Sequence, residues 1–120
     1  MRRTGPTNIV LRKLISELRK SARRYNAPIW NYVAELLMRP SRRRVVVNLG
    51  RLNRYVNDGD VVVVPGKILG AGSLNKRITI AAYSCSLSAL EKIKSSGSRL
   101  ITIKDLIKEF PKGSGVKVII

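Results

Sequence analysis

The first forty residues carry apolar side chains at helical spacing. Between residues 11 and 25 these side chains recur every three or four positions, which places them on one face of a helix. They are Leu11, Leu14, Ile15, Leu18, Ala22 and Tyr25. Pro6-Thr7-Asn8 offers a start for this helix through a side-chain cap. Asn26-Ala27-Pro28 breaks it, and Pro28 suits the first turn of a second helix that ends before Pro40. We therefore expect a helical hairpin.

After residue 44 the pattern changes to short β-branched runs separated by turns. The expected elements are a strand over residues 45–47, a short helix capped by Asn48 that continues through Val56, a turn at residues 57–60 and a strand over residues 61–64. Pro65 and Gly66 are expected to interrupt that strand. Three glycines within residues 66–72 favour tight backbone turns over regular structure.

The remaining pattern again alternates strand and helix. The expected elements are a strand over residues 76–82, a helix over residues 87–94 that follows Ser86 and ends near Gly97, and a strand at residues 100–101. Residues 48–64 resemble residues 102–118 at an offset of 54: both contain a strand, a short helix, a glycine turn and a strand. This repeat indicates an α/β fold with a wound β-β-α layering.

At 120 residues the chain is long enough for one domain with a real core. We expect one structural unit with three parts. These are a basic extended tail (residues 1–6), a basic helical hairpin with an arginine-rich loop (residues 7–44) and a β-β-α core (residues 45–120). The longest uncharged stretch, residues 78–90, is too short and too polar to span a membrane. Arg2-Arg3 is followed by no apolar export region, so a cytoplasmic protein is expected.

The chain is strongly basic. Lys and Arg number 24 against 7 Asp and Glu, which gives a formal net charge of +17. Residues 1–54 contribute +12 of this total and residues 55–120 contribute +5. Such an excess is far beyond what solubility requires of a small domain. The composition therefore predicts a protein that binds a polyanion, mainly through its N-terminal half.

Two segments concentrate this charge. Arg12, Arg19 and Arg23 share one line along the first helix, and only Glu17 offsets its basic residues. Residues 39–44 hold four guanidiniums in six residues, and each presents a planar fork suited to phosphate oxygens and to stacking on bases. The candidate RNA-binding residues are Arg2, Arg3, Arg12, Lys13, Arg19, Lys20, Arg23, Arg24, Arg39, Arg42, Arg43, Arg44, Arg54, Lys67, Lys76 and Arg77.

The side chains that catalysis usually needs are sparse. The chain has no histidine and a single cysteine, Cys85, which excludes a disulfide within the chain and a zinc site of the usual Cys/His kind, and favours a small core residue. Asp58-Gly59-Asp60 is a turn in preference to a metal site. The glycines of residues 66–72 lack the Gly-Lys-Ser/Thr ending of a nucleotide-binding loop. We expect no enzyme, no metal, no cofactor and no small-molecule substrate.

Two alternatives remain open from the residues alone. Trp30 and Tyr32 could stack on bases, although the position of Trp30 within the hairpin favours the core. A chromatin or transcription protein would also be strongly basic, but it would need a major-groove helix or a dimer interface, and the sequence shows neither. An RNA-processing enzyme is disfavoured, because the seven acidic residues form no motif at short spacing.

Several motifs, taken in their order along the chain, resemble those of one known family. They are Ala27-Pro28-Ile29-Trp30, Arg39-Pro40-Ser41-Arg42-Arg43-Arg44, Val47-Asn48-Leu49 with Leu52-Asn53-Arg54, and Val64-Pro65-Gly66-Lys67. In this order they resemble the archaeal and eukaryotic ribosomal protein family L-eighteen-e, and residues 68–74 and 86–89 also resemble its bacterial relative L-fifteen. The resemblance implies an irregular β-β-α superhelix in the large ribosomal subunit, embedded in ribosomal RNA beside neighbouring ribosomal proteins, with no catalysis or cofactor. The compact length is similar to that of archaeal members.

Overall fold

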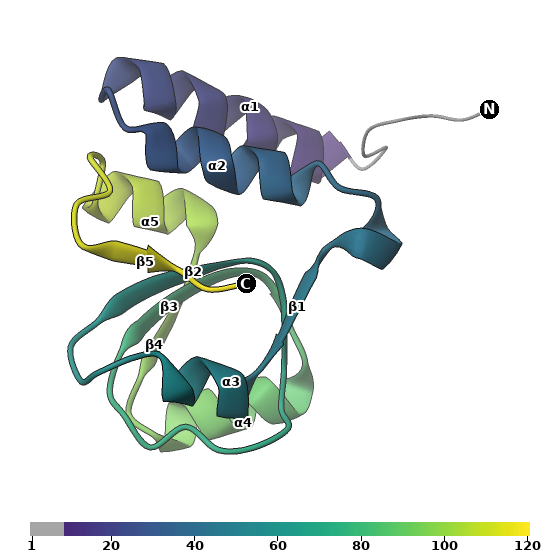
Figure 1. Ribbon diagram of the computed structural model, residues 1–120, viewed down its shortest axis with the longest axis vertical. Coiled ribbons are helices and arrows are strands. Elements are labelled where there is room, and N and C mark those ends of the chain that lie inside the picture. The colour runs from purple at the N-terminus through teal and green to yellow at the C-terminus, as the bar shows by residue number, and fades with distance from the viewer. Residues whose placement is uncertain (1–8) are drawn as a thin grey trace.

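The computed structural model describes residues 9–120 (Figure 1). The expected tail at residues 1–6, the helix start at Pro6-Thr7-Asn8, and the candidates Arg2 and Arg3 lie outside the described residues. The elements in chain order are α1 (Ile9–Arg24), α2 (Pro28–Leu37), the 3-10 turn η1 (Ser41–Arg43), β1 (Val45–Asn48), α3 (Leu49–Arg54), β2 (Val61–Leu69), β3 (Thr79–Cys85), α4 (Leu87–Ser95), β4 (Arg99–Thr102), α5 (Ile103–Glu109) and β5 (Val116–Val118).

All paired strands in the described sheet are parallel, in the order β1-β2-β3-β4. β5 also pairs with β2, along residues 61–63, whereas β1 pairs with β2 along residues 66–69. Since β3 occupies the other edge of β2, β1 and β5 lie one after the other along the same edge. The chain must therefore return to the same end of the sheet after each strand. This confirms the predicted α/β fold.

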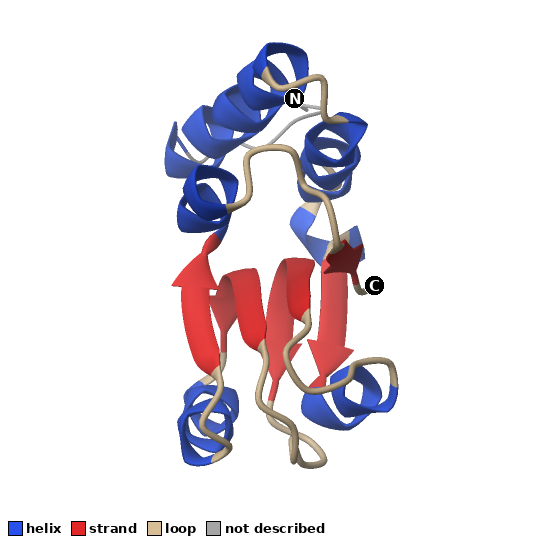
Figure 2. Ribbon diagram, turned by 90° about the vertical axis from the view of Figure 1, so that its left-hand side faces the viewer, coloured by secondary structure: helices blue, strands red, loops and turns tan. Residues whose placement is uncertain are grey.

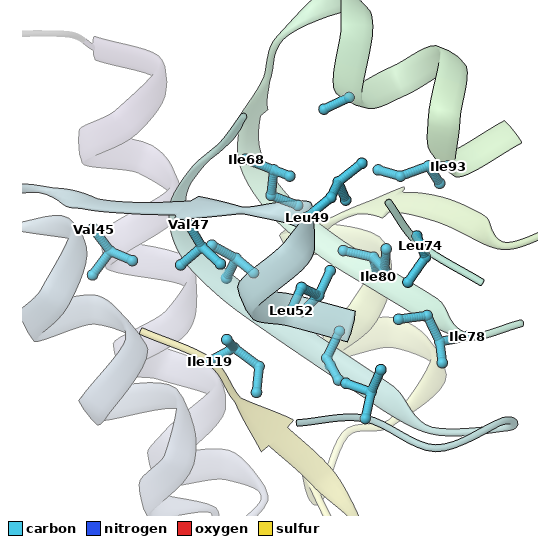
Figure 3. Packing of buried hydrophobic residues seen from close by; sticks show 14 of the residues in the cluster. Val45, Val47, Leu49, Leu52, Ile68, Leu74, Ile78, Ile80, Ile93 and Ile119 are labelled. Carbon is cyan, nitrogen blue, oxygen red and sulfur yellow. The ribbon is translucent and has the colours of Figure 1, made fainter. Parts of the chain in front are cut away.

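Helices cover both faces of the sheet, so the domain has three layers (Figure 2). On one face, α1, α2 and α5 pack with Val63 and Ala81 of the sheet. On the other face, α3 and α4 pack with Val62, Val64 and Ile80, as the view of this core in Figure 3 shows in part. Neighbouring residues of one strand point to opposite faces, and β2 is therefore buried on both.

The predicted helical hairpin is confirmed. Pro28 begins α2, and Asn26 makes the turn between the helices with a φ of 52°. Trp30 is fully buried, as the core interpretation expected, and its Nε1 donates to the carbonyl of Pro111 at 2.7 Å. Tyr32, by contrast, is 44% exposed. The hairpin is thereby attached to the segment between α5 and β5.

The internal repeat also forms as predicted. β1-α3-β2 and β4-α5-β5 each run from strand through a short helix to a strand, and both turns contain a glycine at positive φ, Gly59 and Gly113. The helix starts differ in detail. Thr102 accepts a hydrogen bond from the amide of Asp105 at 3.1 Å, but the Asn48 side chain makes no capping bond and α3 ends at Arg54. Asn48 thus occupies the expected N-cap position without the expected side-chain bond, and the extension of this helix through Val56 was wrong.

The predicted interruption at Pro65 and Gly66 was wrong, because β2 continues through both residues. Its register with β3 shifts between Val64 and Lys67, and such a bulge tolerates a proline that cannot donate a hydrogen bond. A Cβ on Gly66 would overlap the carbonyl oxygen of Val45. Glycine here lets β1 approach β2. Gly66 was expected to end the strand, but it permits the pairing of β2 with β1.

The strand expected over residues 76–82 begins three residues later and ends at Cys85. Cys85 is half-buried and packs against the α3–α4 core, in line with the expected small core residue, and burial raises the pKa of its thiol. Ser86 then caps α4 by accepting from the amide of Ala89 at 3.2 Å. Lys76 and Arg77 consequently lie in the loop before β3.

Candidate nucleic-acid interface

The basic side chains of α1 lie mostly on its outer surface. Leu11, Ile15 and Leu18 are buried against the rest of the domain, which turns the cationic positions outward. Exposed among them are Arg12, Lys13, Lys20, Arg23 and Arg24. Arg19 is half-buried and its Nη2 lies 2.9 Å from Sδ of Met38 in the segment after α2. None of these cations forms an ion pair with a residue in the described range 9–120.

The arginine run continues this surface, because Arg19 contacts Met38 directly before Arg39. The 3-10 turn η1 is closed by the amide of Arg43, which donates to the carbonyl of Pro40 at 2.8 Å. Arg39, Arg42 and Arg43 are exposed. We call the exposed cations of α1 together with Arg39, Arg42 and Arg43 the α1–η1 surface.

Arg44 has a different environment. It is half-buried, its guanidinium lies 5.6 Å from the centre of the Tyr83 ring, and its Nη2 donates to the carbonyl of Arg39 at 3.2 Å. Its Nε is buried and makes no hydrogen bond within the part of the chain that the structure describes. Arg44 therefore orders the arginine loop against β3. Its expected contact with RNA stays a prediction.

The other predicted residues lie in two places. Lys67 pairs in register with Val46 and points away from the α3–α4 core that takes Ile68, and both Lys67 and Val46 are exposed. It thus lies on the side of the sheet from which η1 leads into β1. Arg54 and Arg77 are also exposed, but Arg54 belongs to α3, on the other side of the sheet, and the Arg77 side chain lies close to Gly97, which follows α4. The structure does not join them to the α1–η1 surface.

Lys76 is used inside the domain. Its Nζ donates to the carbonyls of Asn53 at 2.8 Å and Val56 at 2.6 Å. Carbonyls at the end of a helix lack partners within the helix and attract cations. The ammonium of Lys76 thus closes the end of α3. Its predicted role in RNA binding stays a prediction, but its hydrogen bonds already give it a structural one.

Arg51 was not among the predicted RNA-binding residues, although it lies over an aromatic ring. The Arg51 guanidinium lies 5.3 Å from the centre of the Tyr55 ring, and its Nε donates to the carbonyl of Ile120 at 3.0 Å. Tyr55 is 50% exposed. The signal was present as an i, i+4 spacing on a short helix, which brings two side chains together. With Arg54, this pair gives α3 a smaller cationic surface.

The glycine loop between β2 and β3 is held by contacts within the domain. Gly72 has a φ of 85°, and the amide of Gly50 donates to the carbonyl of Ala71 at 3.0 Å. Lys92 Nζ donates to the carbonyls of Gly70 at 2.6 Å and Gly72 at 2.8 Å. Positive φ and close approach by α3 and α4 thus account for these glycines. Lys92, which the sequence analysis did not consider, anchors the loop.

Among the described residues, ion pairs form only between side chains of residues 60–117. Lys117 lies 2.8 Å from Asp60, and Arg99 contacts Glu109 at 2.5 Å. Hydrogen bonds from these cations hold the pKa values of Asp60 and Glu109 below their ordinary values, and Glu109 raises the pKa of Arg99. Acidic groups near α3 and α5 are thus partly neutralised. The α1–η1 surface has no such compensation.

Within residues 9–120 no three His, Cys, Asp or Glu side chains come together in a way that could hold a metal ion. The described helices also include none with the length and apolarity needed to cross a membrane. The domain is an α/β body that exposes many cations on the helical layer formed by α1 and on the adjoining turn η1. Such a surface suits phosphate groups, which dominate the affinity of proteins for nucleic acids.

Comparison with known proteins agrees with this geometry. Residues 46–101 match the family described as ribosomal proteins 50S-L15, 50S-L18e and 60S-L27A. This segment contains α3, β2, β3 and α4, so this part of the fold is similar to a class of ribosomal proteins, whereas the α1–η1 surface lies outside the matched residues. Large ribosomal subunit protein eL18 of Pyrobaculum aerophilum is 50% identical over 117 residues, which cover 98% of this chain and 96% of the relative. The eL18 proteins of Methanopyrus kandleri and Methanococcus maripaludis are 45% and 42% identical, with 97% and 98% of this chain and 95% and 98% of the relatives covered.

The chain therefore belongs to the family of large ribosomal subunit protein eL18. The family resemblance drawn from the sequence motifs is confirmed. Its similarity to archaeal members is also confirmed, since these relatives match nearly end to end.

Proposed function

We propose that this protein is a structural constituent of the large ribosomal subunit, where it binds and stabilises ribosomal RNA through phosphate and shape contacts. It supports translation in the cytoplasm, within the ribosome, and works without catalysis or a cofactor. Its partners are large-subunit ribosomal RNA and neighbouring ribosomal proteins. The observation that carries the proposal is the α1–η1 surface, whose cations have no acidic partner among residues 9–120.

Family membership supports the ribosomal part of this proposal, since the relatives are named as proteins of the large subunit. The physical part follows from charge. A net charge of +17 on a 120-residue chain repels itself unless a polyanion is near. Each phosphate contact releases counterions, so the affinity for RNA should fall steeply with salt.

The test removes Arg42 and Arg43, which are exposed and have no side-chain hydrogen bond among the described residues. Arg44 is left in place because it packs over Tyr83. The variant Arg42→Ala/Arg43→Ala should keep its stability within about 0.5 kcal/mol of the parent. If both residues contact phosphate of duplex RNA, the slope of log affinity against log salt should become shallower by roughly 1.8, at about 0.9 for each contact.

A matched control removes the same charge elsewhere. Lys94 and Lys108 are exposed, on α4 and α5, and the variant Lys94→Ala/Lys108→Ala should leave the slope close to that of the parent. Equal slopes for the two double variants would contradict the role of the arginine run. A preference of the parent for duplex DNA over ribosomal RNA, or failure of the endogenous protein to remain on washed large subunits, would contradict the function itself.

A further inference from the structure

A groove runs between α1 and the C-terminal ends of β3 and β4. It encloses about 620 Å³, within the range of sites that take small organic ligands. Its walls come from α1, from the end of β3 and from the start of α5. In parallel α/β sheets, ligands bind outside the carboxyl ends of the strands, and this groove has that position.

The charge of the groove selects an anion. Lys13, Lys20 and Lys104 line it, and none of the three is ion-paired with a residue that the structure describes. One carboxylate, Glu17, lies among them and is 3.5 Å from the hydroxyl of Ser21. Three ammonium groups against one carboxylate leave the groove cationic. Lys13 and Lys20 are two turns apart on one helix face, about 10 Å along its axis.

The body of the groove is apolar and contains an aromatic ring. Val10, Leu14 and Ile103 contribute apolar surface, and Tyr83 contributes its ring. Arg44 lies over this ring at 5.6 Å and does not line the groove, whereas Tyr83 does. A flat aromatic ligand that bears a phosphate would match both the ring and the lysines.

We infer that this groove binds one unpaired nucleotide of ribosomal RNA, with its base against Tyr83 and its flanking phosphates near Lys13, Lys20 and Lys104. The inference rests on the proposed function, and the groove shares Lys13 and Lys20 with the α1–η1 surface, but no residue of the arginine run lines it. Charge complementarity favours RNA over an acidic peptide, because a backbone phosphate accompanies every base. The base of the nucleotide would contact the Tyr83 ring, whereas a ligand made of phosphates alone would leave the ring without a partner.

The experiment uses the purified full chain and a single-stranded RNA hexamer that carries one 2-aminopurine, with an abasic hexamer as its partner probe. Addition of the hexamer to the parent protein should shift the backbone amide resonances of Leu14, Tyr83 and Lys104. Binding should also change the fluorescence of the 2-aminopurine in the hexamer. Tyr83→Leu should bind the hexamer roughly tenfold more weakly. Tyr83→Phe keeps the ring and should retain parental binding. The abasic hexamer should bind the parent as weakly as the base-containing hexamer binds Tyr83→Leu.

Charge variants give a readout that does not depend on the ring. Lys13→Ala/Lys20→Ala should make the salt slope for the hexamer shallower by roughly 1.4, at about 0.7 for each contact to single-stranded RNA. The control Lys94→Ala/Lys108→Ala should leave it unchanged. Glu17→Gln should strengthen binding several-fold, because it removes the carboxylate of the groove. A site for a basic ligand would show the opposite sign.

The outcomes separate this inference from the proposed function. If ribosomal RNA binds through the arginine run while the groove variants behave like their control, the groove inference is wrong and the proposed function stands. Equal binding of the abasic and base-containing hexamers also overturns the inference, as does preferential binding of an acidic peptide at these resonances. If the parent protein bound neither ribosomal RNA nor the hexamer, the proposed function would be contradicted as well.

Discussion

The variant Lys76→Met tests whether Lys76 is a structural residue or an RNA contact. Its Nζ donates to the carbonyl of Asn53 in the last turn of α3 at 2.8 Å and to that of Val56, two residues beyond the helix, at 2.6 Å. Hydrogen bonds from a charged donor contribute about 1.5–3 kcal/mol each. Lys76 is only half-buried, so water replaces part of this loss. The expected fall in the free energy of unfolding is therefore about 2 kcal/mol in total.

Methionine keeps the aliphatic stem of the side chain, so the change isolates the ammonium. For a domain of this size a loss of about 2 kcal/mol lowers the Tm by roughly 8 °C and the urea midpoint by about 1 M. Trp30, the one tryptophan of the chain, is fully buried, and its fluorescence can report unfolding. The salt slope for ribosomal RNA should stay the same.

The neighbour Arg77 provides the control. It is exposed, and its side chain makes no hydrogen bond within the described range, so Arg77→Ala should change the free energy of unfolding by less than about 0.5 kcal/mol. If it contacts phosphate of duplex RNA, its loss makes the slope shallower by about 0.9. Unchanged stability of Lys76→Met together with a shallower slope would refute the structural role.

Two other sites yield predictions of their own. Gly66→Ala places a Cβ against the backbone of Val45 and should destabilise the protein by at least about 3 kcal/mol in urea unfolding; Gly50→Ala, where a Cβ meets only ordinary contacts, should not. The hydrogen bond from Lys117 lowers the pKa of Asp60, so its stabilisation is complete above the unfolded pKa and is lost as the pH falls through the lower, folded pKa. The stability advantage over Asp60→Asn should therefore be full at pH 6 and shrink below about pH 4; an advantage that grows toward acid would contradict this.

The layers of the fold could be predicted because they follow from local periodicity. The spacing of Leu11, Ile15 and Leu18 fixes the buried face of α1, and Pro28 fixes the start of α2. The repeat of strand, short helix and glycine turn could also be predicted, because Gly59 and Gly113 both adopt a positive φ in the turns. These signals depend on residues that are near in sequence, and local physics is sufficient to interpret them.

The course of β2 could not be predicted in the same way. Pro65 and Gly66 usually end a strand, and whether they do so here depends on β1, which lies twenty residues earlier and approaches the backbone of Gly66. The proline is tolerated at the bulge where the register with β3 shifts. The local sequence pattern does not show which distant strands pair with β2, so it predicted that β2 would end at Pro65 and Gly66.

The candidate interface could be predicted by residue type but not by partner. Composition identified the arginine run and the basic helix, and the structure leaves most of those cations exposed. It could not show that Lys76 closes a helix end or that Arg44 packs over Tyr83. Nor could it bring Lys104 beside Lys13, 91 positions away in the chain. Such juxtapositions arise only from the tertiary fold.

The uneven distribution of ion pairs has a consequence for stability. The two described pairs involve residues 60–117, whereas the exposed cations of the α1–η1 surface form no ion pair among the described residues. Their mutual repulsion opposes packing of the hairpin, and the buried contacts of Trp30 and Leu18 must offset it. Anions that bind the folded surface relieve this repulsion and stabilise the domain by mass action. The hairpin should therefore be the layer whose stability depends most on bound RNA, while the α3–α4 core stays stable without it.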